Sequence, residues 1–261
     1  MATLRALMRL HANSRPDAIM PAPTLAGIEL QLLQVPDAAA ALTPWYALLT
    51  SEERARARRY RRVSDAAAFM IARGALRLLL ARRLGCAPDA LAIVTGDHGK
   101  PGLACLSGQS TAPLEFNVSH SAGLVLIGVA PGGAPIGVDI EGAKPMPRRM
   151  AIARRYFAPA EIAALDALPE DEQAQAFLRC WSRKEAVLKA CGSGLAGGLQ
   201  GFSVPVSAGL PVADNTGAVE VHGWALCDVP VPPGYWAALA FRRGLAVLAW
   251  PQVLAADLLL P

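Results

Sequence analysis

The stretch "WSRKEAVLKACG", residues 181–192, has the period of an amphipathic helix but carries charged residues within its apolar stripe. A helix advances by about 100° per residue. On that spacing one face gathers the apolar residues Phe177, Trp181, Leu188 and Cys191. Lys184 falls in the middle of this face, Glu185 lies at its edge, and Lys189 lies just beyond Glu185. The sequence therefore predicts a long helix whose inner face is partly charged.

Two interpretations of these charges remain open. Glu185 and Lys189 have the i,i+4 spacing of an exposed ion pair, which contributes only a few tenths of a kcal/mol. This interpretation does not account for Lys184, because a charge at a buried position is costly unless a partner neutralises it. The alternative is that this face of the helix meets a cleft that holds charged ligands.

The composition limits the class of protein. A chain of 261 residues with 53% hydrophobic and 18% charged residues is globular, with one large domain or two smaller ones. The net charge of +4 does not by itself imply nucleic acid. The five cysteines form no C-x-x-C pair, which indicates reduced thiols rather than disulfides or zinc. No signal peptide or membrane span is evident, so we expect a cytoplasmic protein that does not bind membranes.

Lysine is rare among the basic residues. Only four of the 25 are lysines, namely Lys100, Lys144, Lys184 and Lys189. Lysine offers a compact point charge, whereas arginine offers a planar fork. A site that needs the compact charge would keep lysine in a chain otherwise rich in arginine.

The pattern of apolar residues predicts helices and strands in both halves of the chain. We expect strands at 27–35, 91–96, 114–120, 124–130 and 136–141, and further strands within 201–250. Helices are expected at 51–63, beginning at Ser51, at 65–85, ending at Gly85, and at about 147–156, 159–168 and 170–191. Residues 130–135, "APGGAP", form the best candidate linker.

Both halves have helices followed by strands, which suggests a duplication. The runs "AAAFMIARGALRLLLA" and "AQAFLRCWSRKEAVLK" each place a long helix after Ala-Phe. Alanine-rich helices resemble one another by chance, so the duplication remains open from the residues alone. We expect an N-terminal subdomain at 1–134, with an extension of unclear role at about 1–45, and a C-terminal subdomain at 135–261.

Three acidic residues are candidates for a metal site. Asp139 and Glu141 in "IGVDIE" are two residues apart in a strand, so both side chains leave the same face. A cation would relieve their repulsion, and an all-oxygen donor set suits Mg²⁺ or Mn²⁺ better than zinc. Glu185 could supply a third carboxylate. The simpler alternative is a strand end with two solvated acids.

Other stretches could bind phosphate. The loop "GDHGKPG" (96–102) offers Lys100 and free backbone N–H groups, and "FNVSHSAG" (116–123) offers Asn117, Ser119 and His120. Six arginines between residues 54 and 62 could bind phosphate or could simply form a solvated helix face. Carboxylates for a divalent cation together with basic loops indicate pyrophosphate chemistry.

In order and spacing, "GKP", "FNVSHS", "IGVDIE", "FAPAE" and "WSRKEAVLKACG" resemble the motifs of the 4′-phosphopantetheinyl transferases. The similarity covers roughly residues 50–200 and is greatest to the large, single-chain type represented by the surfactin synthetase activator. The resemblance implies an α+β pseudo-dimer of two similar subdomains, each a small, mostly antiparallel sheet packed with a long helix. The active site would lie at their interface, and the protein would be a monomer.

The implied reaction is transfer of 4′-phosphopantetheine from coenzyme A to a serine of an apo acyl or peptidyl carrier protein, which releases adenosine 3′,5′-bisphosphate. The carrier is expected to have an acidic surface. The sequence does not tell whether it serves fatty-acid, polyketide or nonribosomal peptide synthesis, or whether acyl-coenzyme A is accepted.

The resemblance also implies roles for single residues. Asp139, Glu141 and Glu185 would hold Mg²⁺, or Mn²⁺, against the pyrophosphate, and either Glu185 or a metal-bound water would be the base. Catalysis would rest on Glu185, Asp139 and Lys189. The residues expected to contact coenzyme A are Lys184, Lys189, Lys100, Pro101, Ser119, His120 and Arg77 or its neighbour Arg73, with Glu161 as a further acid near the site.

The sequence disfavours three alternative functions. A Mg²⁺-dependent nucleotide pyrophosphate hydrolase would need a helix motif such as G-x5-E-x7-R-E-U-x-E-E, which the sequence lacks. A non-catalytic binder of coenzyme A or carrier protein is disfavoured because carboxylates fill all the ligand positions. Nucleic-acid binding through the arginines lacks interleaved aromatic residues beyond Tyr60.

Overall fold

The computed structural model describes residues 27–96, 100–104, 114–192, 198–208, 219–221 and 223–260. Two parts of the sequence predictions lie outside these residues. They are the first 26 residues of the expected N-terminal extension and residues 97–99 of the expected phosphate loop.

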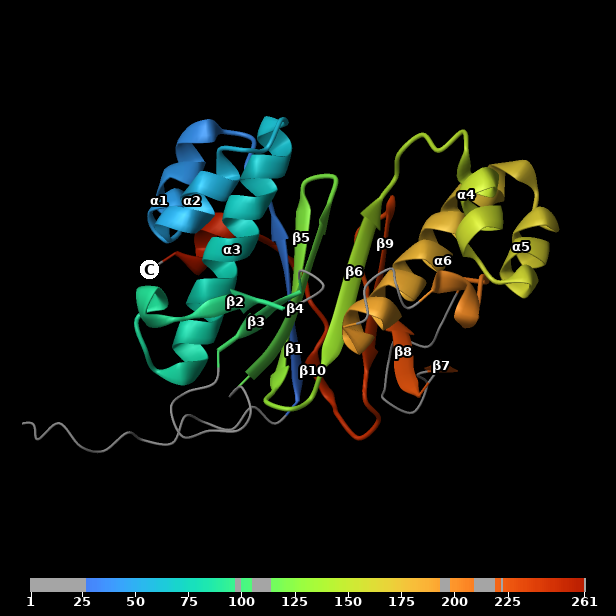
Figure 1. Ribbon diagram of the computed structural model, residues 1–261. Coiled ribbons are helices and arrows are strands. Elements are labelled where there is room, and N and C mark those ends of the chain that lie inside the picture. Colours follow the sequence, from blue (N-terminus) through green and yellow to red (C-terminus); the bar gives the residue numbers. More distant parts are fainter. Residues whose placement is uncertain are drawn as a thin grey trace, which may run out of the picture.

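Two β-sheets pack face to face, and a long helix covers the outer face of each (Figure 1). The first sheet has the order β10-β1-β5-β4, with β11 also paired to β1. Its strands are β1 (Ile28–Gln34), β4 (Leu114–Ser121), β5 (Leu124–Pro131), β10 (Val247–Ala249) and β11 (Val253–Ala255). The second sheet has the antiparallel order β6-β9-β8-β7, with β6 (Ile136–Gly142), β7 (Val219–Val221), β8 (Trp224–Asp228) and β9 (Tyr235–Phe241).

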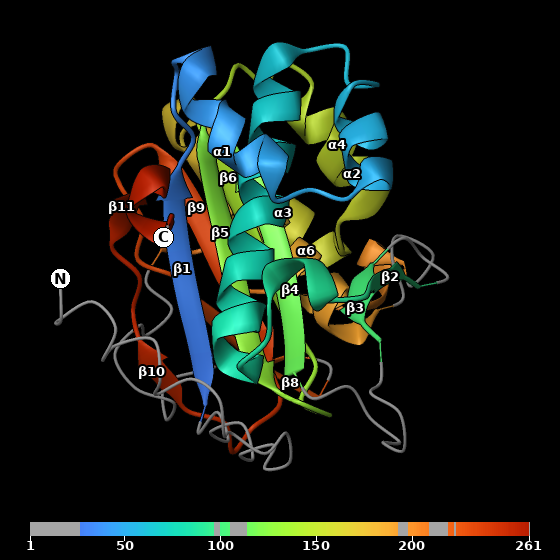
Figure 2. The ribbon, with the colours of Figure 1, turned by 90° about the vertical axis from the view of Figure 1, so that its left-hand side faces the viewer.

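The first sheet is covered by α3 (Val63–Leu84) and the second by α6 (Glu170–Cys191). Figure 2 shows α3 lying along the first sheet, with two shorter helices above it. The shorter elements are α1 (Thr43–Ala47), α2 (Ser51–Ala57), α4 (Arg149–Tyr156), α5 (Pro159–Asp166), the hairpin β2 (Ile93–Thr95) and β3 (Pro101–Leu103), and single 3₁₀ turns at Ala39–Leu42, Pro88–Ala90, Leu199–Gly201 and Ala256–Leu259.

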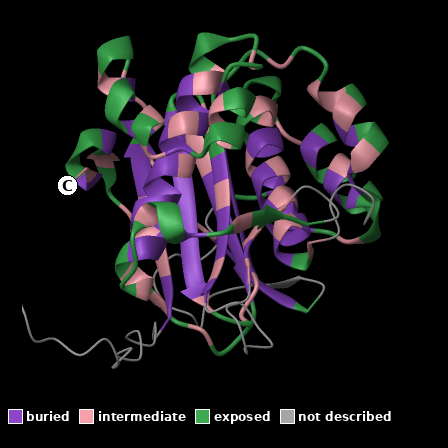
Figure 3. Cartoon of the chain, turned by 60° about the vertical axis from the view of Figure 1, so that its left-hand side comes forward, coloured by how far each residue is buried: buried purple, intermediate pink, exposed green. Residues whose placement is uncertain are grey.

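Each junction between these layers has its own apolar core. Ile71 of α3 packs with Ile127 of β5 in the first core. The even-numbered residues of β6 pack with β1 and β5 between the sheets. Phe177 of α6 packs with Leu226 of β8 in the third core. Figure 3 shows the buried residues concentrated along the strands and the inner sides of the helices.

The mixed α+β class and most of the predicted elements are confirmed. The helix expected at 170–191 has those same bounds, and α3 ends at Gly85, whose φ of 64° is left-handed. The expected basic helix 51–63 is wrong in length, because α2 ends at Ala57. Arg62, the residue before α3, has an extended backbone, so the chain turns between the two helices. Thr50, rather than Ser51, caps α2 through a capping box with Glu53.

The end of the chain returns to the first sheet. Strands β10 and β11 pair in parallel with β1. Of the strands after residue 134, β6 to β9 therefore form the second sheet, whereas β10 and β11 belong to the first. None of the helices in the described part of the chain is long and apolar enough to cross a membrane.

Helix α6 approaches β6 closely because Gly137 has no side chain. A Cβ atom at this position would lie 2.0 Å from the carbonyl oxygen of Ala186 and 2.4 Å from the backbone nitrogen of Ala190. Both atoms belong to the helix backbone, which cannot move aside as a flexible side chain can. The glycine of "IGVDIE" therefore sets the distance between α6 and the strand that carries Asp139 and Glu141.

The close approach predicts that Gly137→Ala destabilises the protein by about 2–3 kcal/mol, the upper range for an overpacked core. Gly102→Ala in β3 is the matched control, because its added Cβ meets no atom within 4 Å. The measurement is the free energy of unfolding of both variants in urea. Equal stability of the two variants would contradict the account of the α6–β6 contact.

Candidate active site

Strands β4 and β6 are joined by side chains where they lie side by side at the edges of the two sheets. Alternate residues of β4 accept hydrogen bonds from backbone N–H groups of β6. The rungs are Asn117 Oδ1 with Val138 N–H (2.9 Å), Ser119 Oγ with Ile140 N–H (3.3 Å) and Ser121 Oγ with Gly142 N–H (3.1 Å). These bonds, here called the β4–β6 ladder, satisfy donors of an edge strand that would otherwise lack a partner strand.

The two serines of the ladder also hold the two acids of "IGVDIE". Ser119 Oγ donates to Asp139 Oδ1 (2.8 Å), and Ser121 Oγ donates to Glu141 Oε2 (3.2 Å). Each hydroxyl thus accepts from the β6 backbone and donates to a β6 carboxylate. Asp139 and Glu141 face α6, as their spacing predicted, because Gly137 on the same face contacts that helix.

Helix α6 contributes a lysine to this cluster. Lys189 Nζ donates to Asp139 Oδ1 (2.6 Å), to Ser119 Oγ (3.1 Å) and to the carbonyl oxygen of Val138 (3.2 Å). Burial raises the pKa of Asp139 and the charge of Lys189 opposes that rise, yet the pKa stays above its usual value. Lys189 therefore pairs with Asp139 and does not form the simple exposed ion pair with Glu185.

Glu185 lies one helical turn before Lys189 and is half-buried. Its pKa is raised, chiefly by burial and then by the nearby charge of Asp139, with a smaller contribution from Glu141. Among the described residues, no hydrogen bond or ion pair engages its carboxylate. The three acids therefore lie within electrostatic reach of one another.

We tested whether these acids fit a divalent cation. Asp139 Oδ2 is buried and has no hydrogen-bond partner in the described part of the chain. All the donor atoms are carboxylate oxygens, which suit Mg²⁺. Within the described ranges, no three His, Cys, Asp or Glu side chains are placed so that they could hold a metal ion together in the present arrangement. The donors fit the ion in their chemistry, while Lys189 and Lys144 neutralise Asp139 and Glu141 in the present arrangement.

Lys184 and Glu161 lie apart from these acids. Lys184 is fully buried, and its Nζ donates to both carboxylate oxygens of Glu161 (2.8 Å each) and to the carbonyl oxygen of Phe202 (2.6 Å). Glu161 also accepts from the backbone N–H groups of Ala158 and Val204. The expected contact of Lys184 with phosphate or pantetheine does not fit this geometry, since its donors are all used. Its place in the apolar stripe is explained by a buried partner.

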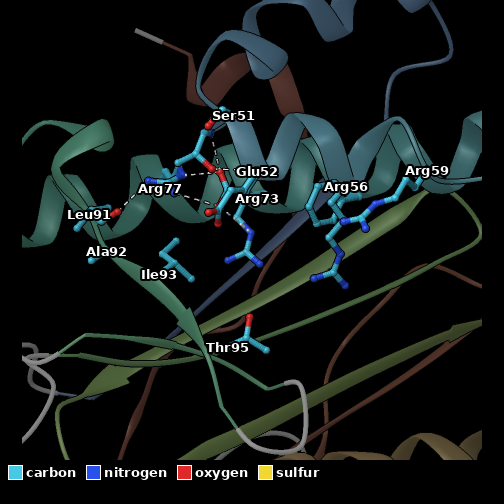
Figure 4. A pocket seen from close by; sticks show the side chains of 13 residues that line it. Ser51, Glu52, Arg56, Arg59, Arg73, Arg77, Leu91, Ala92, Ile93 and Thr95 are labelled. Atoms are coloured by element: carbon cyan, nitrogen blue, oxygen red, sulfur yellow. Dashed lines mark hydrogen bonds and ion pairs between the residues drawn. The ribbon is translucent and has the colours of Figure 1, made fainter.

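A second group of basic residues surrounds a cavity of about 480 Å³ between α2, α3 and β2. In Figure 4 the side chains of Arg56 and Arg73 extend toward the segment that carries Ile93 and Thr95. Arg59 also lines the cavity. This site is the strongest candidate for binding phosphate away from the carboxylates.

Arg73 and Arg77 differ in how many donors they have left. Arg77 is buried and donates to Glu53 through Nε and Nη2 (3.0 Å each) and to the carbonyl oxygens of Pro88 and Leu91. Arg73 pairs with Glu53 at 3.3 Å, but its buried Nη1 has no partner among the described residues. Burial raises the pKa of Glu53, but the hydrogen bonds from Arg77 and the Thr50 N–H, together with the charges of Arg77 and Arg73, hold the pKa below its usual value.

The remaining predicted residues lie around the ladder. Lys100 Nζ donates to the carbonyl oxygens of Lys189 (2.7 Å) and Ile136 (3.3 Å), which ties the β2–β3 hairpin to the end of α6. Pro101 begins β3. His120 is exposed on the face of β4 opposite Ser119, so the two do not share one surface of the strand.

Sequence reasoning missed the ladder roles of Asn117 and Ser121 and the contact role of Gly137. The alternation N-x-S-x-S in "FNVSHS" could have indicated a polar strand face, and it matches the D-x-E spacing of "IGVDIE". Arg56 and Arg59 were among the six arginines expected either to bind phosphate or to form a solvated helix face. Nothing in the sequence shows that they face a cavity.

The buried pair predicts that Lys184→Met lowers the free energy of unfolding by about 3–5 kcal/mol, because Glu161 is left as an uncompensated buried charge. The double variant Glu161→Gln with Lys184→Met removes that charge and should recover a large part of the loss. Urea unfolding of the three proteins measures this. A double variant no more stable than Lys184→Met alone would contradict the proposed cause.

Known proteins resemble this chain in both halves. Residues 135–239 match the 4′-phosphopantetheinyl transferase superfamily, and residues 38–131 match the N-terminal region of 4′-phosphopantetheinyl transferases. The chain is 44% identical over 208 residues to the slr0495 protein of Synechocystis sp. PCC 6803, covering 77% of this chain and 82% of that protein. It is 35% identical over 175 residues to 4′-phosphopantetheinyl transferase HetI of Nostoc sp. PCC 7120 (66% and 73% covered).

A further relative is 4′-phosphopantetheinyl transferase Sfp of Bacillus subtilis, 31% identical over 217 residues, with 79% of this chain and 90% of Sfp covered. The matches span both the segment that carries the arginine cavity and the segment that carries Asp139, Glu141 and Glu185. They confirm the resemblance inferred from the motifs. The chain belongs to the 4′-phosphopantetheinyl transferase family of enzymes.

Proposed function

We propose that the protein transfers the 4′-phosphopantetheine arm of coenzyme A to a serine hydroxyl of an apo carrier protein, with Mg²⁺ or Mn²⁺, and releases adenosine 3′,5′-bisphosphate. The observation that carries this proposal is the cluster of Asp139, Glu141 and Lys189 at the β4–β6 ladder, with Glu185 one helical turn before Lys189. Family membership supplies the type of reaction. The relatives HetI and Sfp are both named 4′-phosphopantetheinyl transferases.

The metal would be held by Asp139, Glu141 and Glu185, the last of which has the free carboxylate. When bound, the cation supplies positive charge to the pyrophosphate oxygens. Lys189 lies in the same cluster and would add a charge-assisted hydrogen bond to a phosphate oxygen. Glu185 would accept the proton of the serine hydroxyl, since no hydrogen bond or ion pair with the described residues occupies its carboxylate.

The nucleotide end of coenzyme A would occupy the cavity between α2, α3 and β2. Arg56, Arg59 and Arg73 would bind its phosphate, and the unpartnered Nη1 of Arg73 offers a buried donor. Of the two candidate arginines, the proposal favours Arg73. Arg77 would support the cavity wall by holding Glu53 and the backbone near Leu91.

The two halves would be similar subdomains, 1–134 and 135–261, with coenzyme A between them. Two features support this pseudo-dimer. Helices α3 and α6 have 22 residues each, and each covers its own sheet. Each ends at a glycine in the left-handed conformation, Gly85 with φ of 64° and Gly192 with φ of 71°.

The partner would be a carrier protein with an acidic surface. Exposed arginines follow one another at the end of α2 and in the turn after it, and they are Arg56, Arg58, Arg59, Arg61 and Arg62. A surface of one sign attracts a partner of the opposite sign and speeds association. The proposal places the protein in the cytoplasm as a monomer.

The class of reaction is tested by mass spectrometry of an apo carrier protein incubated with this protein, Mg²⁺ and coenzyme A. The carrier should gain the mass of one phosphopantetheine. Glu185→Gln should reduce the transfer rate by at least about 100-fold, the usual contribution of a general base, while the protein stays folded. Glu172→Gln, an exposed glutamate on the same helix, is the control and should keep the rate. Full activity of Glu185→Gln would remove Glu185 from the mechanism.

The arginine surface predicts that Arg58→Glu with Arg61→Glu lowers kcat/KM for an acidic carrier about tenfold at low ionic strength and weakens its dependence on salt. The double reversal Arg154→Glu with Arg155→Glu on α4 changes the net charge equally and serves as the control. Rates across a NaCl series give the comparison. If kcat/KM depended on the NaCl concentration to the same extent in the two double variants, the arginine surface would be only solvated.

A further inference from the structure

The turn between β4 and β5 contains a residue in an unfavourable backbone conformation. Ala122 has φ of 47°, and it is the single non-glycine residue with positive φ in the described part of the chain. Gly123 follows with φ of 83°. A residue with a Cβ atom is strained in this region, so surrounding contacts have to hold it there.

Three segments supply those contacts. Tyr235 Oη, at the start of β9, donates to the carbonyl oxygen of Ala122 at 2.6 Å. The N–H of Val35, just after β1, donates to the carbonyl oxygen of Gly123 at 2.8 Å. Gly142, at the end of β6, leaves room for the turn, because a Cβ there would lie 2.4 Å from the Ala122 Cβ. Both sheets therefore fix the turn.

The residue immediately before Ala122 is the last rung of the β4–β6 ladder. Ser121 Oγ accepts from the Gly142 N–H and donates to Glu141 Oε2. Lys144 Nζ donates to the same oxygen at 2.8 Å. Glu141 Oε1 takes part in no hydrogen bond with the described residues. The carboxylate is thus held by one oxygen while the other stays available.

We propose that Ser121 is a positioning residue for Glu141: the strained turn at Ala122 fixes the Ser121 hydroxyl, which holds one carboxylate oxygen of Glu141 and leaves the other for a divalent cation. This rests on the proposed function, in which Glu141 is a metal ligand. A hydrogen bond to a ligating carboxylate restricts its rotation and so favours metal binding. Ser121 touches neither the substrate nor the cation in this role.

The ladder offers an internal comparison. Among the described residues, the Asn117 side chain bonds only to the β6 backbone, which points to a role in joining the strands. Ser121 makes an equivalent backbone bond and also donates its hydroxyl proton to a carboxylate. If Ser121 had a structural role alone, its loss would lower only the stability of the protein. If Ser121 positions Glu141, its loss would also lower the affinity for the cation.

The test uses Mn²⁺ as the probe, with the full-length protein in the presence of coenzyme A and without a carrier. Free Mn²⁺ measured by electron paramagnetic resonance gives the dissociation constant. Ser121→Ala is expected to weaken Mn²⁺ binding about tenfold, the lower range for the loss of an outer partner of a metal ligand. Ser121→Thr keeps the hydroxyl and should bind within about threefold of the wild type.

Ser121→Val is the matched variant, because valine has the shape of threonine without its hydroxyl, and it should resemble Ser121→Ala. It also keeps the test decisive if the alanine variant is poorly folded. Ser64→Ala, at an exposed serine of α3, should change nothing. Thermal unfolding confirms that the variants compared are folded.

Equal Mn²⁺ affinity in the Thr and Val variants would overturn the positioning role of Ser121, while wild-type binding and transfer would leave the proposed function intact. A wild-type protein that neither binds Mn²⁺ with coenzyme A nor modifies a carrier would overturn the proposed function itself. The two failures are therefore distinguishable.

Discussion

The β4–β6 ladder is the contact on which the rest of the site depends. Two sheet edges meet without backbone pairing, and the side chains of Asn117, Ser119 and Ser121 take the place of a partner strand. Because the serine hydroxyls accept from the backbone, their protons are directed to the acids Asp139 and Glu141. The serine hydroxyls that join the two sheets are also the groups that orient the carboxylates.

Helix α6 completes the cluster only because of where it lies on the second sheet. Close approach at Gly137 brings Lys189 to Asp139 and places Glu185 within electrostatic reach of both β6 acids. Neighbouring charged residues on this helix then serve different purposes. Lys184 is paired with Glu161 in the interior and joins α5 to α6, whereas the Glu185 carboxylate has no partner among the residues that the structure describes.

Much of the fold could be predicted from the sequence, because the long helices and the strand 136–141 have regular apolar periods and glycine end signals. The break between α2 and α3 could not, since arginines with good helix propensity continue through it. Motif spacing indicated Asp139, Glu141, Glu185 and Lys189 as one group. It could not show that Lys184 has a buried partner, or that Arg77 is fully bonded while Arg73 is not, because those facts depend on residues distant in the sequence.

The central claim is that acids from two distant segments share one divalent cation beside coenzyme A. The most direct measurement is a crystal structure of the protein with Mn²⁺ and coenzyme A, recorded at the manganese absorption edge. The account predicts one anomalous peak at about 2.1 Å from carboxylate oxygens of Asp139, Glu141 and Glu185, a distance typical of small divalent ions bound by oxygen. An ion bound by other residues, with Asp139 and Glu141 still paired with Lys189 and Lys144, would contradict it.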